Sequence, residues 1–313
     1  MQCLVLGGRG FIGSHLVDAL LAQGHRVRCF DRPHVVPLGE VRQLANPNFE
    51  LYEGDLLSEA DISEALVDCD ICFHLVSTTL PKSSNADPAF DVESNVLATV
   101  RLLSHAVKSG LKKIIFVSSG GTVYGVPVQL PIPETHPTDP VCSYGISKLS
   151  IEKYLDLFHR LHELDFAILR IANPFGERQR THASQGAIAV FLGKVMRGER
   201  VDIWGDGSVV RDYIHIADVV DALTLSMGNT RGERIFNIGA GQGHSLNEVL
   251  SAIEKVTGHR ANRRYLPGRP FDVPASVLCT ARAKKHLGWF PKVGFEQGLE
   301  RFSHWLIKHP NAD

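Results

Sequence analysis

The chain has 313 residues, of which 44% are hydrophobic and 21% charged, and its formal net charge at pH 7 is −1. This composition is typical of a packed globular protein and allows one large α/β domain with a smaller companion. A net charge near zero provides no basic field for nucleic acid or an anionic membrane, so we expect neither as a partner. The sequence begins without a basic leader or a long apolar segment, from which we expect a cytoplasmic protein.

A glycine-rich turn lies between two strand-like segments near the N-terminus. It is the run Gly7-Gly8-Arg9-Gly10-Phe11-Ile12-Gly13. Without a Cβ atom, Gly7 permits a sharp turn, Gly10 permits a close approach by a pyrophosphate, and Gly13 permits tight packing of the following helix. A glycine trio alone could be an ordinary strand-to-helix turn. Here it follows a strand and opens a helix, which is the context that a dinucleotide site requires.

The helix that begins near Phe11 directs its free N–H groups at the phosphates. Asp31 ends the next strand, where a carboxylate accepts hydrogen bonds from an adenosine ribose and repels a 2′-phosphate. We therefore predict NAD rather than NADP. The cofactor contacts expected from this segment are Gly7, Gly10, Phe11, Ile12, Gly13 and Asp31.

A second acid follows the next predicted strand, which ends at Asp55 after a polar connection over residues 32–47. Asp55 and Leu56 would lie at the carboxyl edge of the sheet, where ligands bind in open α/β folds. A helix is expected over residues 56–67, so Asp55 could instead be its cap, and the two roles are compatible. A further strand is expected over residues 71–76.

A helix is expected after Pro88, ending at Gly110. Its apolar face would consist of Val92, Val96, Val100, Leu103 and Val107. A buried strand follows and breaks into hydroxyls and glycines over residues 118–125, at the end where a parallel sheet places its chemistry.

The next helix, from Ser143 to about His162, carries Tyr144 and Lys148 four residues apart, so their side chains lie one turn apart on one face. A lysine ammonium favours the phenolate form of a nearby tyrosine, which could then remove a proton from a sugar hydroxyl while hydride leaves the same carbon for NAD⁺. A helix-start aromatic beside a solvated lysine is the alternative. The upstream nucleotide site favours the catalytic interpretation.

The remaining elements are expected as strands over 166–171, 201–204 and 235–238, and as helices over 185–197, 217–227 and 246–257. Strands that alternate with helices predict an α/β fold with a Rossmann-type doubly wound parallel sheet. We expect an interleaved organisation. Residues 1–174 and 211–240 would form the NAD-binding domain, and residues 175–210 and 241–313 a smaller C-terminal substrate domain. Cys69 and Cys72 have the C-x-x-C spacing of redox and metal sites, but they run into a strand instead of opening a helix. The fifteen histidines show no metal-ligand spacing, so no metal is expected.

Together these motifs resemble the extended short-chain dehydrogenase/reductase family, in its branch of nucleotide-sugar epimerases and dehydratases. The resemblance covers nearly the full length. It rests on Gly7-x-x-Gly10-x-x-Gly13, Gly54-Asp55-Leu56, His74-Leu75, Asn95, Ser118 to Gly125, Tyr144-x-x-x-Lys148, Asn173-Pro174, Arg211-Asp212-Tyr213 and Gly268-Arg269-x-x-Asp272.

The resemblance implies roles for individual residues. Tyr144 would be the catalytic acid and base, Lys148 its electrostatic and ribose-binding partner, and Ser119 the catalytic hydroxyl. Counting back from Val123-Tyr124-Gly125 instead places Gly120 at that position, so Thr122 is the alternative hydroxyl. Further cofactor contacts would be Asp55, Leu56, His74, Leu75, Val76, Asn95, Tyr144 and Lys148. Substrate contacts would be Ser119, Thr122, Tyr144, Asn173, Arg211, Arg269, Asp272 and Ser276.

The resemblance also bears on the reaction. Dehydratases of the family carry a Thr-Asp-Glu run where this chain has Gly120-Gly121-Thr122, without a carboxylate. This leaves 4-epimerisation of a UDP-sugar through a 4-keto intermediate. Ser276 stands where a bulky tyrosine would restrict the sugar's 2-substituent, which predicts activity on UDP-GlcNAc and UDP-GalNAc, with UDP-glucose and UDP-galactose as possible further substrates.

Other functions stay open from the sequence. A UDP-glucuronate epimerase or decarboxylase would need a cation, which Lys82 or Arg178 could supply. An NAD(P)H-dependent 4-keto sugar reductase and a non-catalytic nucleotide-sugar-binding protein are the further alternatives. The family also implies a homodimer, formed through the helix after Pro88 and the Tyr144 helix. The two helices carry more apolar residues than one buried face requires, among them Leu102, Leu155 and Leu157, which agrees with a dimer.

Overall fold

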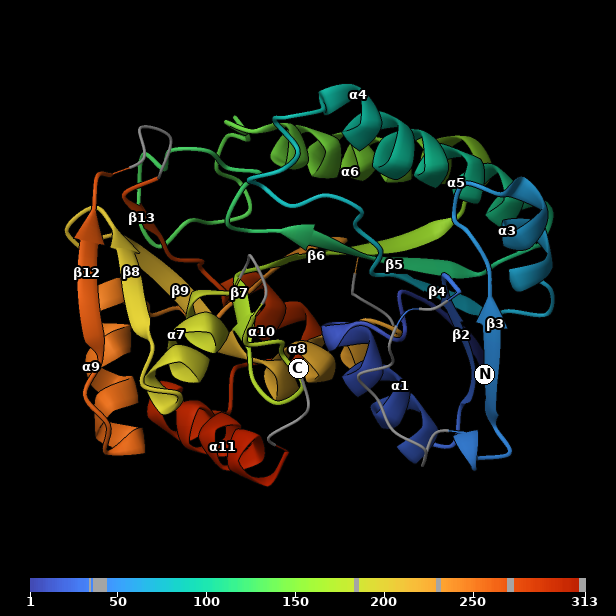
Figure 1. Ribbon diagram of the computed structural model, residues 1–313. Coiled ribbons are helices and arrows are strands. Elements are labelled where there is room, and N and C mark those ends of the chain that lie inside the picture. Colours follow the sequence, from blue (N-terminus) through green and yellow to red (C-terminus); the bar gives the residue numbers. More distant parts are fainter. Residues whose placement is uncertain (34, 36–43, 183–185, 229–231, 269–272, 310–313) are drawn as a thin grey trace.

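The computed structural model describes residues 1–33, 35, 44–182, 186–228, 232–268 and 273–309 (Figure 1). Its main sheet has the strand order β10-β6-β5-β4-β1-β2-β3, and all neighbouring pairs are parallel. These strands are β10 (Ile235–Ile238), β6 (Asp165–Ile171), β5 (Lys113–Ser119), β4 (Ile71–His74), β1 (Gln2–Leu6), β2 (Arg26–Asp31) and β3 (Phe49–Glu53). The order reverses direction between β1 and β4, where open α/β sheets bind their ligands.

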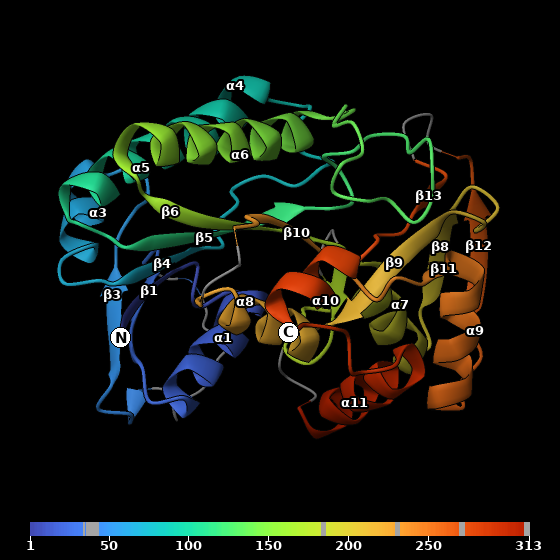
Figure 2. The same ribbon diagram turned by 180° about the vertical axis from the view of Figure 1, so that it is seen from behind.

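Helices cover both faces of this sheet, as the doubly wound prediction requires (Figures 1 and 2). On one face lie α1 (Phe11–Ala22) and α8 (Ile216–Leu225), which pack against each other. On the other lie α3 (Glu59–Ala65), α5 (Ala98–Lys108) and α6 (Ser143–His162). The predicted fold class is therefore confirmed.

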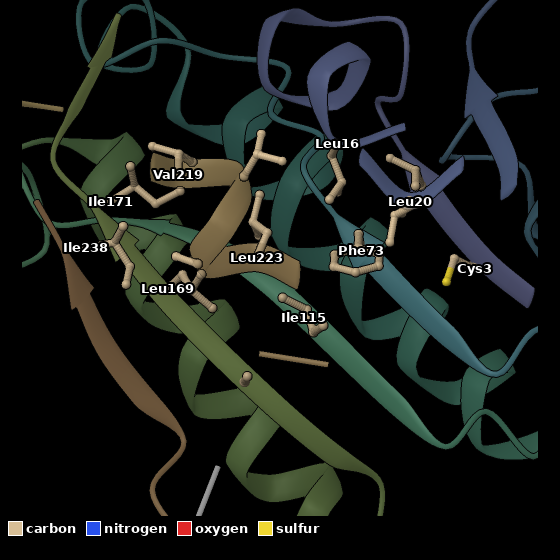
Figure 3. Packing of buried hydrophobic residues seen from close by; sticks show 14 of the residues in the cluster. Cys3, Leu16, Leu20, Phe73, Ile115, Leu169, Ile171, Val219, Leu223 and Ile238 are labelled. Atoms are coloured by element: carbon tan, nitrogen blue, oxygen red, sulfur yellow. The ribbon is translucent and has the colours of Figure 1, made fainter. Parts of the chain in front are cut away.

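Each face has its own apolar core, because every strand presents alternate side chains to opposite sides. Figure 3 shows the core on the α1 and α8 side, where Leu16 and Leu20 of α1 face Phe73 of β4. Leu223 of α8 and Ile115 of β5 extend the same cluster along the sheet. These side chains are at most 1% exposed, so the cluster holds the glycine-rich turn at the start of α1 on a rigid support.

The helix after Pro88 differs from its prediction. It begins with α4 (Pro88–Asp91), passes through a π-helical segment (η1, Val92–Leu97) and continues as α5. The wider π-turn rotates the inward face, so Val92 is 48% exposed whereas Leu102 is fully buried. Of the predicted apolar face Leu103 is fully buried, Val96 and Val107 are half-buried against the same core, and Val92 is the exposed member. Leu155 of α6 also belongs to the core, so it and Leu102 are not spare apolar positions.

The smaller part of the molecule lies beyond the β6 and β10 edge of the main sheet (Figure 1). It pairs β8 (Arg200–Trp204) with β12 (Asn262–Leu266), and β9 (Val210–His215) with β7 (Asn173–Phe175), β11 (Gly243–Ser245) and β13 (Ala275–Ser276). Its helices are α7 (Ala187–Met196), α9 (Leu246–Thr257) and α11 (Phe295–Lys308), while α10 (Ala281–Leu287) lies against β10.

Strand β9 joins the two parts of the chain. It begins at the expected boundary near residue 210, yet it pairs with β7, β11 and β13 rather than with the main sheet. The chain then returns through α8 and β10 to the main sheet, as predicted. The division into two interleaved domains remains our proposal, with β9 at the seam. No described helix is long and apolar enough to cross a membrane.

Candidate active site

The glycine-rich turn forms a cradle between β1 and α1. Gly7 has a φ of +82°, and its N–H donates to the Phe30 carbonyl at 2.8 Å. A Cβ atom on Gly13 would lie 2.1 Å from the Gly7 carbonyl oxygen, so no side chain fits there. Helix α1 has no side-chain cap at Gly10, so its first N–H groups are free to bind an anion. The cradle fits a pyrophosphate.

Asp31 lies at the end of β2 beside this turn. Its carboxylate accepts the backbone N–H groups of Arg9 at 3.1 Å and Arg32 at 3.0 Å. Burial raises the pKa of Asp31, and the two N–H groups oppose the rise. The Arg9 guanidinium pairs with Glu53 at 2.8 Å. The carboxylate is thereby fixed beside the glycine turn, where the sequence placed a ribose contact.

Asp55 is exposed, and its carboxylate accepts the backbone N–H of Leu57 at 2.9 Å. The cap of α3 is Ser58, whose hydroxyl accepts the Asp61 N–H at 3.3 Å. The helix therefore begins three residues later than expected and Asp55 is not its cap. Leu56 is 5% exposed and belongs to the core of the sheet.

His74 is a core residue at the end of β4. It is 2% exposed, and its Nε2 lies 2.9 Å from the Thr99 hydroxyl. Burial lowers its pKa to about 3, and the nearby Lys148 ammonium adds to the effect, so the imidazole is neutral. Leu75 and Val76 follow along the glycine turn. A Cβ atom on Gly7 would lie 3.4 Å from the Val76 Cγ2 atom and 3.5 Å from the Val76 N atom.

Asn95 lies in the π-helical segment, 6% exposed. Its Oδ1 accepts the Thr78 N–H at 3.1 Å, and its Nδ2 donates to the Thr78 hydroxyl at 2.9 Å and to the Asp91 carbonyl at 3.0 Å. The amide therefore holds the segment that follows β4. A π-turn at this position agrees with the frequent occurrence of such turns at functional sites.

Tyr144 and Lys148 lie one turn apart at the start of α6, as predicted. The Lys148 Nζ atom is 5.6 Å from the centroid of the Tyr144 ring and donates to the Val117 carbonyl of β5 at 3.1 Å. No side-chain cap is present at Cys142. The first N–H groups of the helix instead bind the segment before α4: Tyr144 N–H donates to the Ser84 hydroxyl at 3.0 Å.

Lys148 is buried and Tyr144 half-buried, and the loss of hydration is the largest influence on the pKa of both. It raises the pKa of the Tyr144 phenol to about 12, against a hydrogen bond with Ser77. It lowers the pKa of the Lys148 ammonium to about 8, against the carboxylates of Asp91 and Glu152. The sequence predicted that Lys148 would favour the phenolate. In the protein alone burial is the largest influence on the phenol, and the Lys148 ammonium bonds to the Val117 carbonyl rather than to the phenol.

The hydroxyl-bearing loop after β5 packs against the start of α6. A Cβ on Gly145 would lie 2.8 Å from the Thr122 carbonyl oxygen, so glycine is required for this approach. The Cβ position of Gly120 points inward and lies 2.5 Å from the Leu278 side chain. A serine or threonine at position 120 would therefore require a rearrangement. Ser119 is half-buried, whereas the Thr122 Oγ1 atom is fully buried without a partner among the described residues.

A buried polar network lies behind this loop. The Ser118 hydroxyl donates to Glu152 at 2.5 Å, Glu152 pairs with Arg170 at 2.5 Å, and Arg170 donates to the Tyr124 hydroxyl at 2.9 Å. Arg170 and Glu152 are both at most 3% exposed. A paired and hydrogen-bonded ion pair of this kind fixes the position of β5 relative to α6. The sequence offered no signal for it.

Three of the predicted substrate contacts meet at β9. Asn173 Nδ2 donates to the Asp212 carbonyl at 2.9 Å, and Arg211 donates to the carbonyls of Val210 and Val273 at 2.8 and 2.6 Å. Ser276, 5% exposed, pairs with Arg211 across β13 and β9. Arg269 and Asp272 lie outside the described residues. In the part of the chain that the structure covers, no group of three or more metal-ligating side chains occurs.

A doubly wound sheet with a glycine cradle at its switch point, and a buried tyrosine–lysine pair beside β5, defines a dinucleotide-dependent enzyme of the Rossmann type. The model of the NAD dependent epimerase/dehydratase family matches residues 3–239, and the chain belongs to this family. NAD is therefore its cofactor.

The chain is also similar to individual proteins over its whole length. It is 36% identical to the UDP-glucose 4-epimerase of Mycolicibacterium smegmatis over 96% of this chain and 97% of that one. The crystal structure of UDP-glucose 4-epimerase from Thermotoga maritima with UDP-glucose is 38% identical, covers 99% of this chain and 100% of its own, and has a TM-score of 0.92. The UDP-N-acetylglucosamine 4-epimerase of Methanobrevibacter ruminantium, in complex with UDP-N-acetylmuramic acid, is 30% identical over 98% of both chains, with a TM-score of 0.91.

Proposed function

We propose that this protein is an NAD-dependent UDP-sugar 4-epimerase. The observation that carries the proposal is the Tyr144 and Lys148 pair at the start of α6, beside a strand end that bears hydroxyls but no carboxylate from Ser118 to Gly125. Such an end lacks the additional acid and base that eliminating water would require. The similarity to named UDP-sugar 4-epimerases supports the same reaction.

In this reaction Tyr144 removes the proton of the sugar's 4-hydroxyl and later returns one to the 4-keto sugar. NAD, held by the glycine turn and Asp31, would supply the hydride acceptor and donor for C4 of the sugar, which turns between the two transfers. Because burial raises the pKa of the phenol to about 12, a cation beside it is needed to make it a base at neutral pH. Lys148 supplies this charge and also binds the nicotinamide ribose.

We assign the catalytic hydroxyl to Ser119, because it is half-buried at the end of β5 while the Thr122 hydroxyl is enclosed. We expect Ser119→Ala to lower kcat by about 10²-fold through loss of a hydrogen bond to the reacting oxygen. Thr122→Ala is the comparison and should lose less than about tenfold. A larger loss in Thr122→Ala than in Ser119→Ala would transfer the role to Thr122.

The sugar preference follows from Ser276, whose small side chain lies beside Arg211 in the paired strands β13 and β9. A small residue here leaves room for a 2-acetamido group. We therefore propose that the enzyme interconverts UDP-GlcNAc and UDP-GalNAc, and also accepts the plain hexoses. The similarity to both a UDP-glucose and a UDP-N-acetylglucosamine 4-epimerase agrees with such a dual range.

Ser276→Tyr should remove activity on the acetylated sugars selectively. A phenol ring in this position would occupy the volume of the acetamido group, so we expect kcat/KM for UDP-GlcNAc to fall at least about 10²-fold, while that for UDP-glucose falls less than about threefold. Ser276→Ala is the matched control and should retain both activities. An equal loss on the two sugars would refute the steric explanation.

The test of the function itself uses purified protein without added NAD. The protein is incubated separately with UDP-GlcNAc, UDP-GalNAc, UDP-glucose and UDP-glucuronate, and the products are identified by proton NMR. Interconversion of 4-epimers supports the proposal. Turnover only with stoichiometric NAD(P)H and a 4-keto sugar would identify a reductase. Retained NAD with no turnover of any sugar would identify a binding protein.

A uronate-specific enzyme is disfavoured by the surroundings of one candidate cation. Arg178 donates to Asp18 of α1 at 2.6 Å, so its charge is already compensated. Lys82 is exposed in the loop before α4 and stays available. Conversion of UDP-glucuronate alone in the NMR experiment would restore this alternative.

We also propose a homodimer. The helix pair formed by α4 with η1 and α6 exposes large apolar side chains, and their burial against a second copy would be favourable. They are Phe90, Val92, Leu97, Ile146, Tyr154, Leu157 and Leu161, each at least 37% exposed. The mass in solution, measured by light scattering, should be twice that of the chain.

A further inference from the structure

Asp91 is a buried acid that none of the predicted roles includes. It ends α4, is 0% exposed, and its two carboxylate oxygens accept hydrogen bonds from different parts of the chain. Oδ2 accepts the hydroxyls of Ser143 and Ser147, each at 2.7 Å. Oδ1 accepts the Thr79 hydroxyl, and also the Asn95 amide at 3.1 Å. Four side-chain donors therefore converge on one buried carboxylate.

The two serines directly precede Tyr144 and Lys148. Because they are four residues apart, they lie on one face of α6, and a single oxygen of Asp91 holds both. The first turn of α6 has no cap of its own and depends on the Asp91 side of the molecule for its backbone partners as well: Ser143 N–H donates to Asn85 Oδ1 at 2.9 Å. Asp91 thus fixes the turn that carries the catalytic pair.

The other carboxylate oxygen holds the segment that follows β4. Thr79, bound to Oδ1, lies two residues after Ser77, whose hydroxyl donates to the Thr79 carbonyl at 3.2 Å and whose side chain lowers the pKa of Tyr144. The Asn95 Nδ2 group donates to both the carboxylate and the backbone carbonyl of Asp91. The Asn95 Oδ1 atom accepts the backbone N–H of Thr78. One carboxylate therefore joins the helix that carries Tyr144 to the segment after β4.

We propose that Asp91 is a positioning residue for the epimerisation: through Ser143, Ser147 and Thr79 it sets the orientation of Tyr144 and Lys148 relative to the segment after β4. This rests on the proposed function, in which those two residues do the chemistry. Asp91 touches neither substrate nor cofactor in this assignment, and it acts through its neighbours. It also places a negative charge close to Lys148.

That charge has a defined effect on Lys148. Burial lowers the pKa of the ammonium to about 8, and Asp91 is the larger of the two opposing influences, followed by Glu152 of α6. The other titratable groups near this site are His74 of β4, which is neutral, Tyr144 itself, and the Cys142 thiol, whose pKa is raised by burial. Removing the Asp91 charge should therefore lower the Lys148 pKa further.

The test is Asp91→Asn in the NAD-loaded enzyme, since asparagine keeps the shape but removes the charge and replaces one acceptor oxygen with an NH₂ group, which cannot accept from a hydroxyl. We expect kcat with the best UDP-sugar to fall 10- to 100-fold while KM changes less than threefold. The alkaline limb of kcat should move to lower pH, because Lys148 now loses its proton earlier. The ratio of variant to wild-type activity should therefore be larger at pH 6.5 than at pH 8.5. An unchanged pH profile, or a loss entirely in KM, would overturn the proposal.

Asp218→Asn is the matched control. Asp218 is 2% exposed and accepts the N–H groups of Lys292 at 2.9 Å and Val293 at 3.0 Å, away from α6. Its replacement should lower the melting temperature without moving the pH profile. If Asp91→Asn does not fold, Ser147→Ala and Ser143→Ala remove single donors. Each should lower kcat at least threefold with KM unchanged, and no effect in either would contradict the proposal.

A readout independent of turnover separates this inference from the function. The Tyr144 phenol is titrated by ultraviolet difference spectroscopy in the NAD-loaded protein, with Tyr144→Phe subtracted. Asp91→Asn should change the Tyr144 pKa by at least half a unit even if no UDP-sugar is epimerised. In that case the function fails while the positioning role stands. An unchanged Tyr144 titration would refute the role itself.

Discussion

Replacing Tyr144 by phenylalanine should lower kcat by about 10³-fold or more while NAD stays bound. Loss of a general acid and base typically costs 10²- to 10⁴-fold, and here the same oxygen is needed in both proton transfers. The Tyr144 ring is half-buried, and phenylalanine differs from tyrosine only by the hydroxyl, so the variant keeps the packing of the ring. Progress curves by proton NMR give kcat, and NAD released on denaturation is quantified by absorbance.

Tyr154→Phe provides the control for this variant. Tyr154 lies on the same helix but is 37% exposed, so its hydroxyl is remote from the buried pair. We expect activity within twofold of wild type. If Tyr144→Phe retained more than a tenth of the wild-type kcat, the proton would have to pass through another group, and the assignment of Tyr144 as the base would be wrong.

The second large effect is expected at the cofactor cradle. In Gly13→Ala the new methyl group would lie 2.1 Å from the Gly7 carbonyl oxygen and 2.7 Å from the Gly8 Cα, and both are backbone atoms. The turn or helix α1 must shift to relieve this overlap, at a cost of about 1 to 3 kcal/mol in stability. The shift also misplaces the N–H groups that we propose as the pyrophosphate site. We expect the purified variant to contain less than about a tenth of the wild-type NAD.

Gly294→Ala separates this effect from the general consequences of replacing glycine. No atom lies within 4 Å of its Cβ position, and its φ of −65° suits alanine. Its NAD content should equal that of wild type and its melting temperature should change little. A full complement of NAD in Gly13→Ala would mean that the turn can open without loss of binding, contrary to the cradle described here.

The sequence by itself determined the parts of this protein that depend on local spacing. The glycines of residues 7–13 need no distant partner to form the turn, because their missing Cβ atoms decide which backbone conformations are allowed. The alternation of apolar strands with helices was enough for the doubly wound sheet. The four-residue interval between Tyr144 and Lys148 placed them on one helical face wherever that helix lies.

Patterns that rest on helical periodicity failed where the helix was not regular. The π-turn after Asp91 rotated the following residues, so Val92 faces outward and Leu102 inward. An alternating or 3.6-residue pattern carries no information about such a turn, because polar residues inside the fold create it. Here the Asn95 amide bonds to the Asp91 backbone carbonyl within the turn.

Only the tertiary structure decided how Tyr144 and Lys148 are held. The serines bound by Asp91 are 52 and 56 residues away, and the Ser84 hydroxyl that receives the Tyr144 N–H is 60 residues away. The Glu152 and Arg170 pair and the contact between Gly145 and Thr122 join separate elements in the same way. Serine, aspartate and glycine are common in loops and caps, so their roles depend on which partner the folded chain brings within hydrogen-bonding distance.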